Sequence, residues 1–178
     1  MIRRRATGAV IGAGTIAAGV IVAAASFGVH RGSAPALSQP SKSARMVCSP
    51  SGQEDIAGVL GTTPTAPVTA AWVDHLYACT YMYAEGHMLV SVKELENAAA
   101  TTAYFTSVQA GLGSGSEVAG IGEDAFQGSG GSVLVRKDFN VLLVDVSGLP
   151  ARIGSPPVDR ATAALDVATA VMGCWTGA

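Results

Sequence analysis

The stretch of sequence that decides the fold is His75–Glu94, HLYACTYMYAEGHMLVSVKE. Its first part, His75 to Tyr83, is rich in aromatic residues, which favour β-strands. Gly86 marks a tight turn, and in His87 to Glu94 the side chains alternate with the two-residue period of a strand, Met88, Val90 and Val92 against Leu89, Ser91 and Lys93. Two strand-like runs on either side of a turn predict an antiparallel hairpin.

A second hairpin is predicted farther along the chain. Ser132 to Lys137 and Val141 to Ser147 flank the turn residues 138–140. The run 141–144, VLLV, is apolar at every position, which is typical of a strand covered on both faces, so we expect it near the centre of the sheet. Between the hairpins, a loop-rich region is interrupted at 118–127, where a further short strand is expected.

Three helices complete the predicted fold. Ser51–Glu54 matches a capping box and Gly61 a left-handed helix end, so they bound a short first helix. Asn97 caps a second helix that runs to about Ala110, and Pro156 lies at the start of a third. At 100° per residue, the apolar side of the third helix comprises Ala164, Ala168, Val171, Met172 and Trp175. The order of elements predicts an α+β fold, an antiparallel sheet of four to five strands with about three helices packed on it.

Residues 1–36 have the character of an export segment. Arg3–Arg5 precede the uncharged, largely apolar run 6–29, and arginines on one side of such a run hold that side in the cytoplasm. The run is long enough for a membrane anchor, whereas its many Ala and Gly residues and the small-residue sites at 23–25 and 34–36 fit a cleaved signal peptide. Both fates remain open, and both place the rest of the chain outside the cytoplasm, secreted or tethered to the cell membrane.

The remainder divides into a polar linker at 37–46 and a single domain at 47–178. Without the four arginines of residues 1–36 it holds 7 basic and 13 acidic side chains, a formal charge of 7 − 13 = −6. A net negative charge argues against nucleic acid as a partner, because nucleic-acid binders carry a basic surplus. It also predicts repulsion from anionic lipid headgroups.

Several features of the domain resemble a known family. Cys48 precedes the capped first helix, Trp72 and the strand cysteine Cys79 follow, and then come the segment 120–126, GIGEDAF, a Val-rich hairpin and an Ala-rich terminal helix. This pattern resembles the domains of unknown function found in actinobacterial secreted proteins and lipoproteins, over about residues 47–175. The resemblance implies a cell-envelope location and an α+β domain, and it supplies no catalytic residue. The chain departs from the family in lacking a lipid-acceptor cysteine.

The three cysteines allow three pairings, and outside the cytoplasm a pair of thiols tends to oxidise. We favour the disulfide Cys48–Cys79, which the resemblance implies and which joins the first helix to the first strand. Cys174 is then left over, either as a half-buried thiol or as half of an intermolecular disulfide. The sequence contains no C-x-x-C motif, so a redox or metal site built on cysteine is not expected.

Other residues that could carry chemistry lack the partners that chemistry needs. His75 and His87, with Glu85 between them, are too few for a typical metal site and are expected to be exposed. No G-x-S-x-G motif is present, and Gly113–Ser116 lacks the lysine of a phosphate-binding loop. Glu123–Asp124 are neighbours in sequence rather than carboxylates facing each other across a cleft. We therefore expect no catalytic residue, no metal and no cofactor.

Aromatic side chains suggest an alternative to catalysis. If Tyr77, Tyr81 and Tyr83 share the outward face of their strand with His75 and Cys79, they could line an interaction surface, because aromatic residues are enriched in interfaces. The leading hypothesis is an envelope module without enzymatic activity that binds a protein or wall component. A carrier of a small apolar ligand between sheet and helices is the alternative, and a hydrolase with dispersed catalytic residues is less favoured.

Overall fold

The computed structural model describes residues 38–175, and everything below concerns this part of the chain. The predicted signal peptide or anchor lies outside the described residues. Within 38–175, no helix combines the length and the hydropathy that crossing a bilayer requires. The prediction of a mixed α+β fold with an antiparallel sheet is confirmed, whereas the predicted number of elements is too small.

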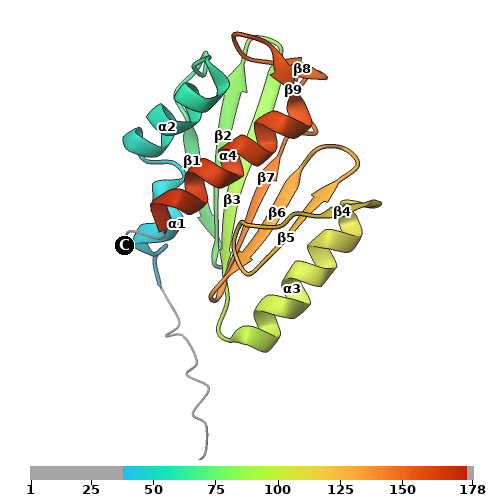
Figure 1. Ribbon diagram of the computed structural model, residues 1–178. Helices are drawn as coiled ribbons and strands as arrows, with labels where there is room; N and C mark the ends of the chain where they lie inside the picture. The colour runs from blue at the N-terminus through green and yellow to red at the C-terminus, as the bar shows by residue number, and fades with distance from the viewer. Residues whose placement is uncertain (1–37, 176–178) are drawn as a thin grey trace, which may run out of the picture. The chain divides into compact units, whose positions relative to one another are not determined.

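The centre of the fold is a seven-stranded antiparallel sheet with the strand order β1-β2-β3-β7-β6-β5-β4 (Figure 1). Its strands are β1 (Thr69–Val73), β2 (Leu76–Tyr83), β3 (Gly86–Glu94), β4 (Gly115–Glu117), β5 (Asp124–Gly128), β6 (Val133–Lys137) and β7 (Asn140–Asp145). A separate two-stranded ribbon consists of β8 (Arg152–Ile153) and β9 (Val158–Asp159). The described helices are α1 (Lys42–Met46), α2 (Pro50–Leu60), α3 (Ala98–Gly111) and α4 (Arg160–Trp175).

Both predicted hairpins are present. In the β2–β3 hairpin Tyr83 pairs with Gly86, and in the β6–β7 hairpin Lys137 pairs with Asn140. A third hairpin joins β1 to β2 through a two-residue turn in which Asp74 and His75 have φ values of 48° and 57°. Two successive positive φ angles are typical of the type I′ turn, whose twist matches that of the two strands it joins.

The sheet separates two apolar layers. Helices α1, α2 and α4 cover one face, and Figure 1 shows α4 running diagonally across the strands with α2 beside it. Helix α3 covers the other face at β6 and β7, where Phe105 packs with Leu134 and Val141. Strand β7 is the fourth of seven strands and has helices on both faces, which confirms the central position predicted from its uninterrupted apolar run.

The helix ends show where local sequence signals hold and where they do not. Asn97 caps α3 as predicted, and Gly61 ends α2 in the left-handed region with φ 61°. The cap of α2, however, is Ser49, whose hydroxyl accepts the Gly52 N–H at 3.1 Å, so the predicted capping box begins two residues too late. The third predicted helix begins at Arg160 instead of near Pro156, because the chain first forms β8 and β9.

The predicted linker at 37–46 is also corrected. Residues 42–46 form α1, and Ala44 on this helix is fully buried against the main core. The Glu94 carboxylate further ties this segment to the sheet by accepting the Ser41 N–H at 3.1 Å. The packed unit therefore begins before Val47, since the apolar side of α1 is needed to cover the sheet.

Candidate functional site

The disulfide Cys48–Cys79 is present, as predicted, with its Cα atoms 5.7 Å apart. It joins the segment between α1 and α2 to the middle of β2, where Cys79 is fully buried. Both cysteines of this pair are thus committed to holding the helical layer on the sheet. Neither is available as a redox or metal-binding thiol.

The tyrosine surface predicted from the sequence does not exist as such. Tyr77, Tyr81 and Tyr83 do share one face of β2, but it is the face that the helices cover, and Tyr81 and Tyr83 belong to the main core. The prediction of an exposed surface is therefore wrong for these two residues. Alternation along a strand shows which side chains share a face, but it does not show which face is buried.

The two buried tyrosines differ in one respect. The Tyr81 hydroxyl donates a hydrogen bond to the carbonyl oxygen of Val47, whereas the Tyr83 hydroxyl has no partner. It is the one buried side-chain nitrogen or oxygen without a partner in the described part of the chain. Burial raises the pKa of both phenols well above the usual value, so both stay protonated and act as donors. An unpartnered buried donor costs about 1–3 kcal/mol, so the Tyr83 hydroxyl needs an explanation.

The two histidines of the first hairpin lie far apart. His75 is in the β1–β2 turn, where its ring packs edge-on against Trp72 with the centroids 5.7 Å apart. His87 is exposed at the opposite end of the hairpin, paired with Met82, and its ring covers Gly148. Among residues 38–175, no group of three or more His, Cys, Asp or Glu side chains is close enough to hold a metal ion.

The nearest approach to a catalytic arrangement surrounds Asp145. Its carboxylate accepts hydrogen bonds from the Ser132 hydroxyl and the Ser147 N–H, both at 2.9 Å. Burial by itself would raise the pKa of Asp145, but the hydrogen bonds from Ser147 and Ser132 and the nearby His87 hold it below the usual value. The Ser132 hydroxyl in turn accepts the N–H of Val146. Ser132 is buried and fully engaged in closing the end of β7, which is a structural role.

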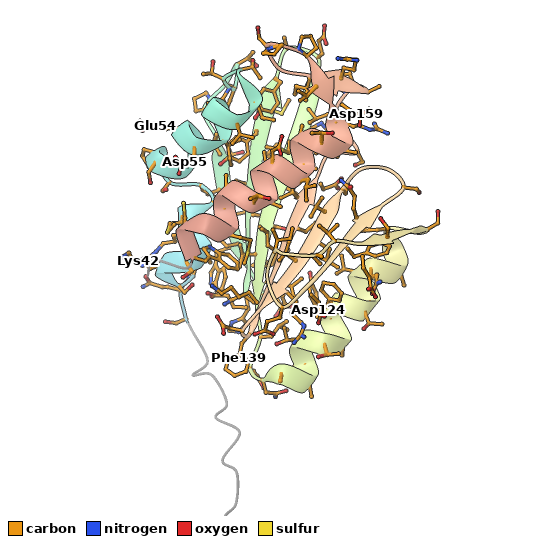
Figure 2. The ribbon with its side chains drawn as sticks, in the orientation of Figure 1. Lys42, Glu54, Asp55, Asp124, Phe139 and Asp159 are labelled. Carbon is orange, nitrogen blue, oxygen red and sulfur yellow. A yellow bond between two sulfur atoms is a disulfide. The ribbon has the colours of Figure 1, made fainter. Side chains whose placement is uncertain are left out.

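The neighbouring carboxylates Glu123 and Asp124 both pair with Arg136. The Glu123 carboxylate lies 3.1 Å from the guanidinium, and Asp124, labelled at the start of β5 in Figure 2, accepts from Nε at 2.7 Å. Glu123 also accepts the N–H of Asp138. One cation between two exposed carboxylates forms a surface ion cluster, so the pair does not act as facing acid and base.

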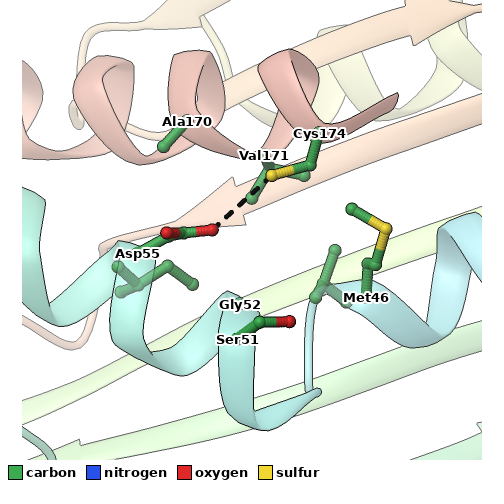
Figure 3. A pocket seen from close by; sticks show the side chains of 9 residues that line it. Met46, Ser51, Gly52, Asp55, Ala170, Val171 and Cys174 are labelled. Carbon is green, nitrogen blue, oxygen red and sulfur yellow. Dashed lines mark hydrogen bonds between the residues drawn. The ribbon is translucent and has the colours of Figure 1, made fainter. Parts of the chain in front are cut away.

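A small pocket lies between α1, α2 and α4, as Figure 3 shows. Met46, Ile56 and Val171 contribute apolar walls, and the Cys174 thiol lies 3.6 Å from the Asp55 carboxylate. Burial, together with this carboxylate, raises the pKa of Cys174, so the thiol is a weak nucleophile. The cavity volume is about 20 Å³, room for about one water molecule and too little for an apolar ligand.

Two exposed large apolar side chains lie on the outer part of the sheet. Because α3 packs on β6 and β7, it leaves the same face of β1 and β2 uncovered, where Val73 is 69 % exposed and Met82 is 42 % exposed. Strand β1 is also an edge of the sheet. Within residues 38–175, no hydrogen bond other than those of the β2 pairing involves β1.

The turn that joins β1 to β2 determines which backbone groups of β1 are free. In a two-residue hairpin the closing pair, here Val73 and Leu76, exchanges both of its hydrogen bonds, and bonded pairs then alternate along the strands. Ala71 therefore bonds to β2, whereas the N–H and C=O groups of Ala70 and Trp72 point outward. The opposite edge strand, β4, is only three residues long, so β1 is the longer of the two open edges.

A broader hollow adjoins the β2–β3 turn and the segment that carries β8 and β9. It is lined by Thr62 after α2, by the β2–β3 turn with Tyr83 and Glu85, and by Arg152, Ile153 and Pro157 of the ribbon. We call this the Tyr83 hollow, and its volume is about 360 Å³. No single stretch of sequence marks it, because its walls come from three segments that meet only in the folded chain.

Comparisons with protein-family models, with curated proteins and with solved structures find no match for this chain.

Proposed function

We propose that the chain is a cell-envelope module without enzymatic activity that binds a partner protein by adding an extended segment of that partner to β1. The observation that carries this proposal is the open outer edge of β1. An unpaired edge strand is a template for a further strand, and natural proteins normally protect such an edge with charges, proline or a bulge. Strand β1, with the sequence TAAWV, has no charge and no proline.

The uncovered face beside β1 supports the same proposal. In strand addition the backbone hydrogen bonds supply affinity, and alternate side chains of the added segment contact the neighbouring surface. On the face that α3 leaves open, the exposed side chains of Val73 and Met82 lie near opposite ends of β2, so each is placed to contact one end of an added segment. Because residues 37–178 carry a net charge of −6, a neutral or basic segment fits better than an acidic one.

The roles of the polar side chains favour binding over catalysis. Ser132 and Asp145 close the end of β7, Arg136 neutralises Glu123 and Asp124, and the two histidines lie at opposite ends of one hairpin. Export remains an expectation from the first 36 residues, and it places the binding surface on the outer side of the membrane. The carrier hypothesis gains no support from the helix-lined pocket, which is too small.

The proposal is tested with a basic peptide of alternating Lys, Val and Thr, using amide hydrogen exchange of the full chain as the readout. We expect the peptide to slow exchange at Ala70 and Trp72, because their outward N–H groups become bonded. Ala70→Pro removes one of these donors without removing a β1–β2 bond and should abolish binding, whereas Ala70→Ser keeps the donor and should bind normally. A peptide with a central proline is the matched control.

Three results would overturn the proposal. One is unchanged exchange at both amides in the presence of saturating peptide. The second is equal binding by the Ala70→Pro and Ala70→Ser proteins, which would place the peptide elsewhere. The third is retention of the chain by purified cell wall with no response to any strand-forming peptide, which would replace the protein partner by a wall component.

A further inference from the structure

We propose that the segment that adds to β1 is the β1 strand of a second copy of this chain, so that two copies join edge to edge as an antiparallel dimer. The inference rests on the function proposed above, because it names the partner of the same edge. The two-fold axis of the dimer passes between the Ala71 residues of the two strands, perpendicular to the sheet, and the sheet of one copy continues into that of the other.

The hydrogen-bonding groups that β1 leaves free match those of a second β1. Ala71 lies at the centre of the five-residue strand and its backbone groups bond to β2, whereas those of Ala70 and Trp72 point outward. When two such strands run antiparallel about Ala71, Ala70 of each copy lies opposite Trp72 of the other. Each of these pairs exchanges both of its hydrogen bonds, so every outward N–H and C=O group of Ala70 and Trp72 gains a partner.

Side-chain sizes favour the register centred on Ala71. The large Trp72 side chain then lies opposite the small Ala70 of the other copy on one face of the sheet, and Val73 lies opposite Thr69 on the other face. Val73 is 69 % exposed in the single chain, and this pairing covers part of it. A register centred on Ala70 or Trp72 would leave Val73 or Thr69 without a partner in β1, so only the register about Ala71 pairs all five residues.

The edge carries no charge that opposes self-pairing. Strand β1 has no ionisable side chain, and the nearest charge along the chain, Asp74, forms an ion pair with Lys93 at 3.1 Å. The net charge of −6 over residues 37–178 repels a second copy at longer range, where physiological salt screens it beyond about 8 Å. The dimer should therefore become tighter as salt is added, whereas binding of a basic segment at the same edge should become weaker.

Pairing at β1 ends with two copies. The opposite edge strand, β4, is three residues long and contains the charged Glu117, so it is a poor template for a further strand. A contact between β1 of one copy and β4 of the next would leave an open edge at each end and would continue into a filament. A contact between two β1 strands uses the same surface on both copies and therefore closes.

Sedimentation equilibrium of the full chain tests the association. We expect the apparent mass to double as the protein concentration rises from about 1 µM to about 1 mM, because an interface of one short strand is a weak one. Ala70→Pro removes an outward N–H from each strand and should keep the chain at the lower mass. Association through any other part of the chain would be equal in the two proteins, so their difference reports β1. Added salt should lower the dissociation constant of the unmodified chain.

Cysteine substitutions test the register, in a Cys174→Ser background that lacks the free thiol. Opposite residues of a pair without hydrogen bonds have Cα atoms about 4.5 Å apart, so Ala71→Cys should form a covalent dimer under mild oxidation by air. Ala70→Cys is the matched control, because the two positions 70 are offset by two residues and lie roughly 8–9 Å apart, too far for a disulfide. Urea unfolding shows whether each variant keeps the fold.

Four outcomes would overturn this inference. They are the mass of a single copy at the highest concentration, equal association by the unmodified chain and Ala70→Pro, a dimer that salt weakens, and no more covalent dimer from Ala71→Cys than from Ala70→Cys.

The peptide experiment described above separates these failures from a failure of the proposed function. If the peptide slows exchange at Ala70 and Trp72 in a chain that stays monomeric, the second copy is ruled out and strand addition stands. If neither the peptide nor a second copy occupies β1, both proposals are wrong.

Discussion

Separate replacement of Tyr81 and Tyr83 by phenylalanine should have opposite effects on the free energy of unfolding. Both residues lie on the covered face of β2 in the main core, and each substitution removes a single oxygen. The Tyr81 hydroxyl donates to the carbonyl of buried Val47, so Tyr81→Phe leaves that carbonyl without this donor. The Tyr83 hydroxyl has no partner to lose.

The magnitudes follow from the cost of unpaired polar groups. Loss of the Tyr81 hydrogen bond should destabilise the fold by about 1–3 kcal/mol, whereas removal of the unpartnered Tyr83 hydroxyl should be neutral or stabilise it by up to about 1 kcal/mol. Equilibrium unfolding in urea, followed by tryptophan fluorescence, measures both. With a slope of about 1–3 kcal/mol per molar urea, a loss of ~2 kcal/mol lowers the midpoint by about 1 M.

The reasoning is refuted if Tyr83→Phe destabilises the protein as much as Tyr81→Phe. That result would mean that the Tyr83 hydroxyl is satisfied in solution and contributes to the stability of the free protein. The slope serves as a control, since an unchanged slope shows that both variants expose the same surface on unfolding.

Three other substitutions test particular parts of the fold. Replacing Cys48 and Cys79 together by alanine should lower the free energy of unfolding by roughly 3.5–4 kcal/mol, because the unfolded chain is no longer constrained by a disulfide between residues 31 positions apart. Cys174→Ser is the control and should leave the urea midpoint unchanged. Asn97→Ala should cost about 1 kcal/mol by the same measurement, because the side chain caps α3 at the Ala100 N–H, and an unchanged midpoint would contradict this role. The folded-state pKa of Asp145 lies below its usual value of about 4, so its contribution to stability is present above that pH and is lost as pH falls through the folded-state pKa. In the Asp145→Asn variant the urea midpoint should therefore decline less steeply as the pH falls than in the unmodified protein. An equally steep decline in the two proteins would contradict this contribution of Asp145 to stability.

The elements that sequence reasoning found are those with strong local signals. The β2–β3 and β6–β7 hairpins follow from alternation around turn residues, and α3 follows from the cap at Asn97. The apolar side of α4 is likewise buried as the helical period predicts, and Asp166 on its opposite side is exposed. Each of these signals lies within a short stretch of chain, so no knowledge of distant contacts is needed.

The elements that it missed have no such signal. Strand β1 is five residues long and β4 three, too short for a period to emerge, and both are strands because a neighbour pairs with them. Helix α1 is five residues long in a polar stretch, and its place in the core depends on Ala44 meeting the sheet. The N-terminal part of the predicted last helix became the β8–β9 ribbon for the same reason, since pairing of Ile153 with Val158 competes with local helix formation.

By itself, then, the sequence determined the α+β class, the two main hairpins and the central position of β7, because periodicity and turn chemistry act over a few residues. Tertiary structure alone decided that the tyrosine face of β2 is covered, that β1 forms an open edge, and that Thr62, Tyr83 and Arg152 surround one hollow. Both faces of β2 carry side chains that tolerate burial. Which of them is buried depends on where α1, α2 and α4 come to pack, and such contacts join distant parts of the chain, as the separation of 34 residues between Tyr81 and Val47 illustrates.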